Sequence, residues 1–235
     1  MWQSALLPVA LDAFVPPLAP LVALAFLGTG LLLVGLAVGA GVAFAARRRR
    51  LAAALGGGAA TVAFAYAVAL GGAALLSGER TLSPGERKYF CEMDCHIAYE
   101  VVGATPSAGG RRAITVRTWF DPSTIAPFRG DAPLAPGPRD VYVTDGAGRR
   151  FLPSADATTA WRAAHPGSEP FGKALRPGQS ATTTFVFDLP ADVRSPRLFV
   201  GDPEGGLDRF VIGHENSPFH GRIYFAMPSA TAGRG

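Results

Sequence analysis

The chain lacks charge over two long stretches near its start. Of its 235 residues, the 26 from position 21 to 46 and the 26 from position 51 to 76 contain no Asp, Glu, Lys or Arg. About 20 apolar residues are enough for a helix to cross the hydrocarbon core of a bilayer, so each stretch can span a membrane with some tilt. The absence of ionisable residues inside both stretches argues against a transporter, a proton path or a channel.

Basic residues are absent before position 47, where four follow one another. Arg47, Arg48, Arg49 and Arg50 separate the two apolar stretches. An arginine at the bilayer centre costs roughly 2.5 kcal/mol or more, so we expect all four at a membrane surface, and the positive-inside rule makes that surface cytoplasmic. Residues 21–77 are therefore predicted to form a transmembrane hairpin in a bacterial inner (cytoplasmic) membrane. Both termini would lie on the periplasmic or extracellular side, and contact with anionic lipid headgroups would account for the arginines.

The start of the chain lacks the basic region of a cleaved signal peptide, and the first apolar stretch is longer than a signal-peptide core. Residues 1–20 are predicted to lie in the lipid–water interface on the outer side of this membrane, a position that suits the indole of Trp2. Glycines are frequent in both apolar stretches, and Gly35 and Gly39 stand at GxxxG spacing. Small residues let helices approach closely, either within the hairpin or against another membrane subunit.

The remainder of the chain has almost no net charge. Residues 1–77 hold four arginines against the single acid Asp12, whereas residues 78–235 hold 18 Lys and Arg against 17 Asp and Glu. No basic face suggests a nucleic-acid partner. The chain also has no G-x-S-x-G, no H-E-x-x-H and no glycine-rich phosphate loop, so no enzymatic activity is predicted.

Residue periodicity changes after position 77. Residues 78–88 are polar, carry Pro and Gly, and are predicted to be a linker, and the stretches that follow alternate apolar and polar residues as half-buried strands do. Strands are expected at 96–102, 113–120, 140–144, 149–152, 182–189, 197–200, 209–212 and 222–227, with one helix at 155–164. Because there is no βαβ alternation, residues 89–228 are predicted to form an antiparallel β-sandwich, followed by a flexible tail at 229–235.

One segment of this region resembles a known group of domains. Residues 175–180 read Leu-Arg-Pro-Gly-Gln-Ser, and they are followed by a strand-like stretch at 182–187 and by Asp-Leu-Pro at 188–190. This succession resembles a pattern in bacterial exported Ig-like domains, related in shape to secreted immunoprotective antigens, which are usually anchored by a lipid or a helix. The resemblance implies an Ig-like fold. Its motifs specify turns and strand ends, so it implies no catalytic residues.

The chain has only two cysteines, Cys91 and Cys95. Residues four apart in a flat strand are ~13 Å apart, whereas a disulfide needs Cα atoms about 4.4–6.8 Å apart, so the chain must bend here or bind something. In an oxidising compartment a disulfide between the two is expected. The alternative is a metal: Cys91, Cys95 and His96 offer soft ligands that suit copper, and His214 and His220 could complete the set.

The order of hairpin and β domain is also similar to subunit II of haem-copper oxidases, whose dinuclear copper site uses a Cys-x3-Cys motif. That family carries its cysteines late in the domain, whereas here the pair opens it and His96 follows Cys95 directly. The sequence thus predicts a membrane-anchored, extracytoplasmic Ig-like interaction module without a cofactor. Its expected partners are the bilayer and a protein in or at the membrane, for instance as an accessory subunit of a larger complex. A copper-handling or redox domain is the alternative.

Overall fold

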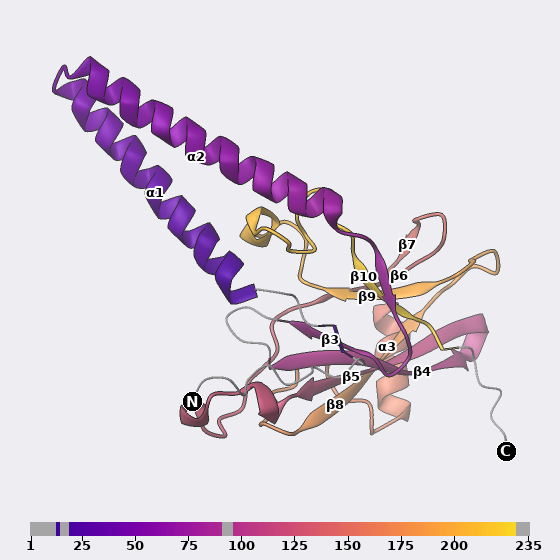
Figure 1. Ribbon diagram of the computed structural model, residues 1–235. Coiled ribbons are helices and arrows are strands. Elements are labelled where there is room, and N and C mark those ends of the chain that lie inside the picture. Colours follow the sequence, from indigo (N-terminus) through magenta and orange to yellow (C-terminus); the bar gives the residue numbers. More distant parts are fainter. Residues whose placement is uncertain (1–12, 15–18, 91–95, 229–235) are drawn as a thin grey trace. The chain divides into compact units, whose positions relative to one another are not determined.

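The computed structural model describes residues 13–14, 19–90 and 96–228 (Figure 1). The chain forms two compact units. Among the described residues, one unit contains 19–78 and Gly205–Arg222, and the other contains 13–14, 79–90, 96–204 and 223–228. Most of the predicted interfacial segment at 1–20 and the predicted tail at 229–235 lie outside the described residues.

The first unit is built on a hairpin of two helices. Helix α1 runs over Ala19–Ala45 and α2 over Arg49–Leu76, and the two pack side by side (Figure 1). The turn between them reverses the chain at Arg47, whose φ of 57° is in the left-handed region. Helix α2 ends where Ser77 becomes extended and its N–H donates to the carbonyl of Ala74. Two long apolar helices are therefore confirmed, each starting within two residues of its predicted limit.

The second unit contains two five-stranded sheets. The first sheet has the order β1 (Ala13–Phe14), β3 (Arg87–Phe90), β4 (Ile97–Ser107), β5 (Arg111–Phe120) and β8 (Ser180–Phe187). The second has the order β2 (Arg80–Leu82), β10 (Ile223–Ala226), β9 (Arg197–Gly201), β6 (Asp140–Thr144) and β7 (Arg150–Phe151). Helix α3 (Ala155–Ala164) coincides with the predicted helix.

The two sheets share one hydrophobic core. Alternate residues of the strands point into it, for example Ile114 and Val116 of β5 and Leu198 and Val200 of β9, all of which are almost fully buried. This period of two is the pattern from which the strands were predicted, because successive side chains of a strand face opposite sides of its sheet. The β-rich domain with two sheets is confirmed. An Ig-like arrangement of its strands stays a prediction.

The outer edge of β8 is covered by the segment that contains α3. The hydroxyl of Thr158 accepts a hydrogen bond from the backbone N–H of Val186 at 3.0 Å, and that of Ser168 accepts one from Thr184 at 3.0 Å. The N–H of Ser154 donates to the carbonyl of Val186. Edge strands carry unpaired backbone groups that invite aggregation, and here side chains and loop backbone satisfy them.

Three sequence expectations need correction. Residues 78–88, predicted to be a linker, contain β2 and the start of β3, because strands this short show no readable alternation. The strand predicted at 209–212 is wrong: Leu207–Phe210 forms a 3-10 turn, η4, between positive-φ glycines at 205 and 213. The sheets are not purely antiparallel, since β1 pairs with β3 and β2 with β10 in parallel, a direction that residue periodicity does not specify.

Candidate functional sites

The helical hairpin is apolar along its length. Large side chains at least about half exposed occur along α1, namely Leu21, Leu24, Leu27, Leu31, Leu32, Val34, Val38, Val42 and Phe44. Consecutive residues of a helix differ by 100° in direction, so these positions spread over about two thirds of the circumference, and the rest of α1 carries no charged residue to form a polar face. Both helices are long and apolar enough to cross a membrane.

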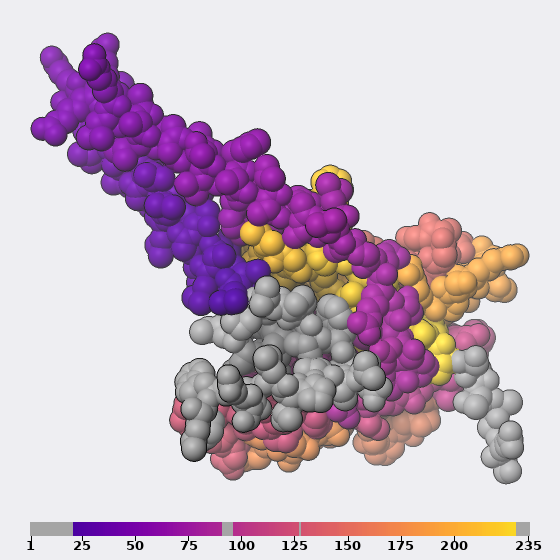
Figure 2. Space-filling model, in the orientation of Figure 1, coloured from indigo at the N-terminus to yellow at the C-terminus, as the bar shows by residue number. Residues whose placement is uncertain are grey.

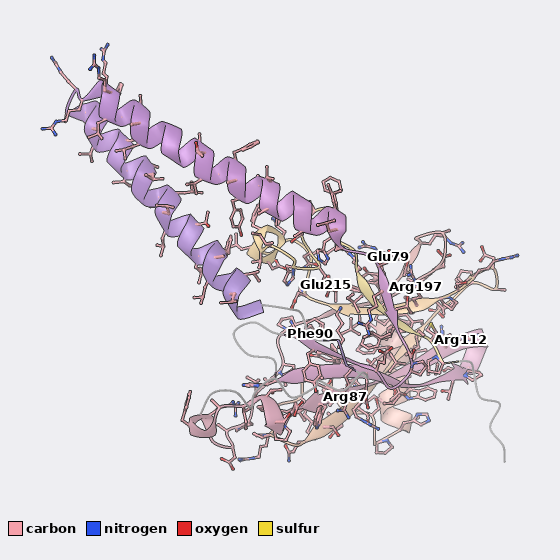
Figure 3. The ribbon with its side chains drawn as sticks, in the orientation of Figure 1. Glu79, Arg87, Phe90, Arg112, Arg197 and Glu215 are labelled. Carbon is pink, nitrogen blue, oxygen red and sulfur yellow. The ribbon has the colours of Figure 1, made fainter. Side chains whose placement is uncertain are left out.

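The four arginines lie at the turn of this hairpin. Arg47 and Arg48 belong to the turn, and Arg49 and Arg50 begin α2. Nitrogen-bearing side chains project from this tip of the hairpin in Figure 3. The first turn of α2 contains no acidic residue, so cations occupy the helix end that favours anions. That arrangement suits contact with external anions such as lipid phosphates.

The two glycines of the predicted packing motif differ in their surroundings. A Cβ placed on Gly39 would come within 3.3 Å of Leu55 Cδ1 on α2, whereas one on Gly35 would meet nothing within 4 Å. Gly39 therefore faces the partner helix closely, and Gly35 faces open space. Packing of both residues at one interface stays a prediction.

The predicted cysteine site is described only at its flanks, because Cys91 and Cys95 lie outside the described residues. Phe90 and Ile97 are paired across β3 and β4, so the segment between them joins two neighbouring strands. His96 is buried and stacks against Phe120, and its Nδ1 lies 2.8 Å from the hydroxyl of Thr124. The residues on either side of the cysteine segment are thus fixed by strand pairing and by packing against Phe120.

A hydrogen-bond network adjoins the same segment. The hydroxyl of Tyr89 donates to Asp121 at 2.6 Å, and the backbone N–H of Asp121 donates to the carbonyl of His96 at 2.8 Å. Burial, and then the hydrogen bond to Asp121, raise the pKa of Tyr89 far above its usual value. Tyr89 is therefore a neutral donor at physiological pH.

The remaining predicted metal ligands are in the other unit. The Nδ1 of His214 accepts a hydrogen bond from the N–H of Asn216 at 3.1 Å, and the Nδ1 of His220 lies 2.7 Å from the carbonyl of Gly221. Among the described residues, no three His, Cys, Asp or Glu side chains gather as metal ligands would. Because both cysteines are outside that set, the copper alternative stays a prediction.

A cleft of about 490 Å³ opens where the beginnings of β5 and β9 meet the end of β10. Its lining comprises Thr81, Arg112, Ser195, Pro196, Arg197, Ala226, Met227 and Pro228. The guanidinium of Arg197 donates to Glu79 at 2.9 Å and lies over the ring of Tyr224. No carboxylate in the described part of the chain pairs with Arg112. Figure 3 labels both arginines.

This cleft combines the guanidinium of Arg112 and the Arg197–Glu79 ion pair with apolar lining residues. Guanidinium groups bind carboxylates and phosphates through paired hydrogen bonds, and an apolar floor adds contact area for the carbon atoms of a ligand. Ser195 enters the cleft with a φ of 48°, a conformation that costs energy for a residue other than glycine and often marks a functional site. No local sequence pattern brings these residues together, because Arg112 and Arg197 are 85 positions apart.

Two further cations are buried inside the β unit. The ammonium of Lys88 on β3 donates to the carbonyl of Val200 at 2.7 Å and of Ile223 at 3.3 Å, so it connects the two sheets. Arg139 forms an ion pair with Asp202. Period-two alternation places Lys88 on the same face as the core residue Phe90, a signal that was available in the sequence.

Comparisons with other proteins give distant structural likenesses. No model of a known protein family and no curated protein matches this sequence. A secreted protein of Mycobacterium tuberculosis, MPT63, is 13% identical, with a TM-score of 0.36 over 53% of this chain and 98% of its own. The yjhA protein of Bacillus subtilis is 14% identical, with a TM-score of 0.34 over 62% of this chain and 98% of its own.

A conserved hypothetical protein of Bacillus anthracis is 11% identical, with a TM-score of 0.31 over 45% of this chain and 80% of its own. TM-scores this low do not establish a shared fold.

Proposed function

We propose that this chain is a membrane-anchored module whose β domain lies outside the cytoplasm and binds a protein partner in or at the membrane. The observation that carries the proposal is the hairpin of two uncharged helices with many exposed apolar side chains and four arginines at its turn. The partner would be a larger membrane complex in which this chain is an accessory subunit.

The size of the exposed apolar surface supports the anchor. Burying one large aliphatic side chain contributes about 1.5–3 kcal/mol relative to leaving it in water. Nine such side chains on α1 alone are at least about half exposed, so a hairpin in water would lack on the order of 10 kcal/mol of this stabilisation. This is comparable to the whole stability of a typical domain, about 5–15 kcal/mol. Lipid supplies the apolar surroundings that the hairpin requires.

The charges support one orientation. Arg47–Arg50 are the only basic residues in the first 77, so they carry the whole topological bias of the hairpin. Placed at the cytoplasmic surface, they leave the chain that follows α2 on the opposite side. The β domain would then occupy the periplasmic or extracellular space.

The cleft at Arg112 and Arg197 supports binding of a partner. Its charge favours an acidic segment, and its Pro and Met lining favours a segment with apolar side chains as well. We assign to it an acidic peptide segment of a membrane-associated protein. Binding there would need no change in the core, because the lining residues lie at strand ends.

The anchor is tested by extraction at alkaline pH. The full chain should stay in the membrane pellet in carbonate buffer, and its intact mass should show that α1 is retained. A shortened mass lacking α1 would mean that the first helix is a cleaved signal. Release of the full chain into the supernatant would contradict the anchor.

Partner binding is tested by crosslinking in cells. A photoreactive residue at Met227, inside the cleft, should give a discrete adduct that disappears when Arg112→Glu is added. The matched control is Arg176→Glu, which changes the same charge at a surface arginine outside the cleft and should leave the adduct intact. An adduct that survives Arg112→Glu would show that the cleft does not bind through its charge.

A further inference from the structure

The loop at 205–222, between β9 and β10, belongs to the same compact unit as the helical hairpin. Two hydrogen bonds attach it to α2 and its end. The hydroxyl of Tyr66 donates to the carbonyl of Phe210 at 2.7 Å, and the N–H of Gly221 donates to the hydroxyl of Ser77 at 2.7 Å. Figures 1 and 2 show this yellow segment beside the C-terminal half of α2.

These attachment points lie on the two sides of the expected membrane boundary. Helix α2 has 28 residues and is about 42 Å long, whereas the hydrocarbon core is about 30 Å thick and takes about 20 residues. Counted from the arginine turn, the core ends near Leu70. Tyr66 then lies about 6 Å inside the core and Ser77 about 10 Å beyond it. The loop therefore follows α2 across the boundary opposite the arginines.

The loop presents large apolar side chains outward. Leu207 is 71% exposed, Phe219 is 85% exposed and Phe210 is 45% exposed. Phe219 has a φ of 67°, a conformation that an aromatic residue rarely adopts. Three exposed side chains of this size within 18 residues make the loop a candidate for contact with a nonpolar environment.

Several polar groups of the loop are paired within it, although the side-chain oxygen of Asn216 is buried and has no hydrogen-bond donor among the described residues. The guanidinium of Arg209 donates to the carbonyls of Gly205 and Gly206, and the amide of Asn216 donates to Asp208 at 2.5 Å. The hydroxyl of Ser217 donates to the carbonyl of Val211 at 2.7 Å. Internal pairing of this kind is what a backbone near lipid requires, because lipid offers no hydrogen bonds.

We propose that the loop at 205–222 is a second membrane-contacting element, which enters the leaflet opposite the arginine turn and places Leu207, Phe210 and Phe219 among the lipids. The inference rests on the proposed membrane anchor and goes beyond it. The depth of about 6 Å set by Tyr66 matches the ~5–10 Å by which interfacial segments bury their apolar face. Lipid is the occupant because the loop is attached to α2 at Tyr66, which lies inside the expected hydrocarbon core.

Three matched substitutions test the proposal in the full chain. Phe64→Trp probes the middle of α2, where the side chain is 73% exposed; Phe219→Trp probes the loop; and Phe128→Trp, 93% exposed, probes the β unit. Each variant is reconstituted in phosphatidylcholine–phosphatidylglycerol vesicles whose acyl chains are brominated near the headgroup end. The fluorescence of the unsubstituted chain is subtracted to remove the three native tryptophans.

Bromine should quench the added fluorescence of Phe64→Trp and Phe219→Trp and leave that of Phe128→Trp unchanged. Leu207→Trp should behave as Phe219→Trp does, and it replaces that variant if the latter does not fold. If Phe64→Trp is quenched while both loop probes match Phe128→Trp, the loop is outside the lipid and the inference is wrong, although the anchor stands. If Phe64→Trp is not quenched, the anchor itself fails.

Discussion

At the scale of single residues, Glu100 shows how a buried charge is held on a sheet surface. Its carboxylate lies on the face of β4 opposite the core, accepting hydrogen bonds from Arg87 at 3.1 Å and Arg117 at 2.6 Å. Arg87 also lies over the ring of Trp119 at 4.1 Å. These four side chains come from three neighbouring strands, so the ion pairs reinforce the register of β3, β4 and β5.

Removing the charge of Glu100 should weaken this part of the sheet. We expect Glu100→Gln to lower the free energy of unfolding by about 1–2 kcal/mol, because a hydrogen bond to a charged group contributes about 1.5–3 kcal/mol and both arginines stay partly hydrated. Asp131→Asn removes a charge from an exposed pair and should change stability by less than about 0.5 kcal/mol. Chemical denaturation measures both variants. Equal effects would mean that the burial of Glu100 contributes nothing.

The folding stability of the protein should depend on pH through the carboxylate of Asp145. Burial acts to raise the pKa of Asp145, but hydrogen bonds from the side chain and backbone of Arg149 and from the N–H of Ala147 outweigh it, so that its pKa lies below the usual value. A depressed pKa contributes stability above the unfolded pKa of about 3.9, and this contribution is lost as pH falls through the folded pKa.

Melting temperatures measured as a function of pH test whether this stabilisation is lost as the pH falls. Asp145→Asn should melt below the parent chain at pH near 7, and the difference should shrink as pH falls below about 4. Asp131→Asn should melt as the parent does at every pH. A constant difference for Asp145→Asn across the range would show that its charge does not matter.

At the scale of elements, the covering of β8 can be tested by one methyl-for-hydroxyl exchange. Thr158→Val keeps the shape of the side chain but leaves the N–H of Val186 without its acceptor, so we expect a loss of about 1–3 kcal/mol in unfolding free energy. Thr159→Val makes the same exchange at the next, exposed position of α3 and should be nearly neutral. If the two variants are equally stable, the helix does not protect the edge through this bond.

The sequence predicted elements well where their pattern was long and repeated. The two apolar helices, α3, the strands β5 and β8 and the first part of β4 follow directly from periodicities of 3.6 and 2, whereas β4 continues beyond the predicted limit at 102, past a bulge, to Ser107. Short strands such as β2 escaped prediction because three residues carry no period and their pairing with β10 is a tertiary event. The strand predicted at 209–212 is absent because positive-φ glycines at 205 and 213 let the chain turn, and an apolar stretch this short does not distinguish a turn from a strand.

The candidate sites could likewise be predicted only where their residues are contiguous in the sequence. The arginine turn is contiguous and was read from sequence, whereas the cleft at Arg112 and Arg197 exists only because β5 and β9 end at one place. Likewise, the attachment of the loop at 205–222 to Tyr66 joins residues 144 positions apart, which no local pattern reveals.

At the scale of the whole molecule, the two cysteines report on the compartment. We expect Cys91 and Cys95 to form a disulfide in protein isolated from membranes, because an oxidising compartment favours it and the chain offers no other cysteine. Mass spectrometry of unreduced, alkylated protein should find neither thiol modified. Two alkylated cysteines together with a stoichiometric metal would instead support the copper alternative.

The most direct test of the membrane-anchored, exported module is a pair of reporters fused in turn after Gly235. Alkaline phosphatase, which is active only outside the cytoplasm, should be active, and a fluorescent protein that matures only in the cytoplasm should be dark. Neutralising Arg47–Arg50 should give mixed signals, since these residues carry the orientation bias. A bright fluorescent fusion with inactive phosphatase in the unmodified chain would place the β domain in the cytoplasm and contradict the account.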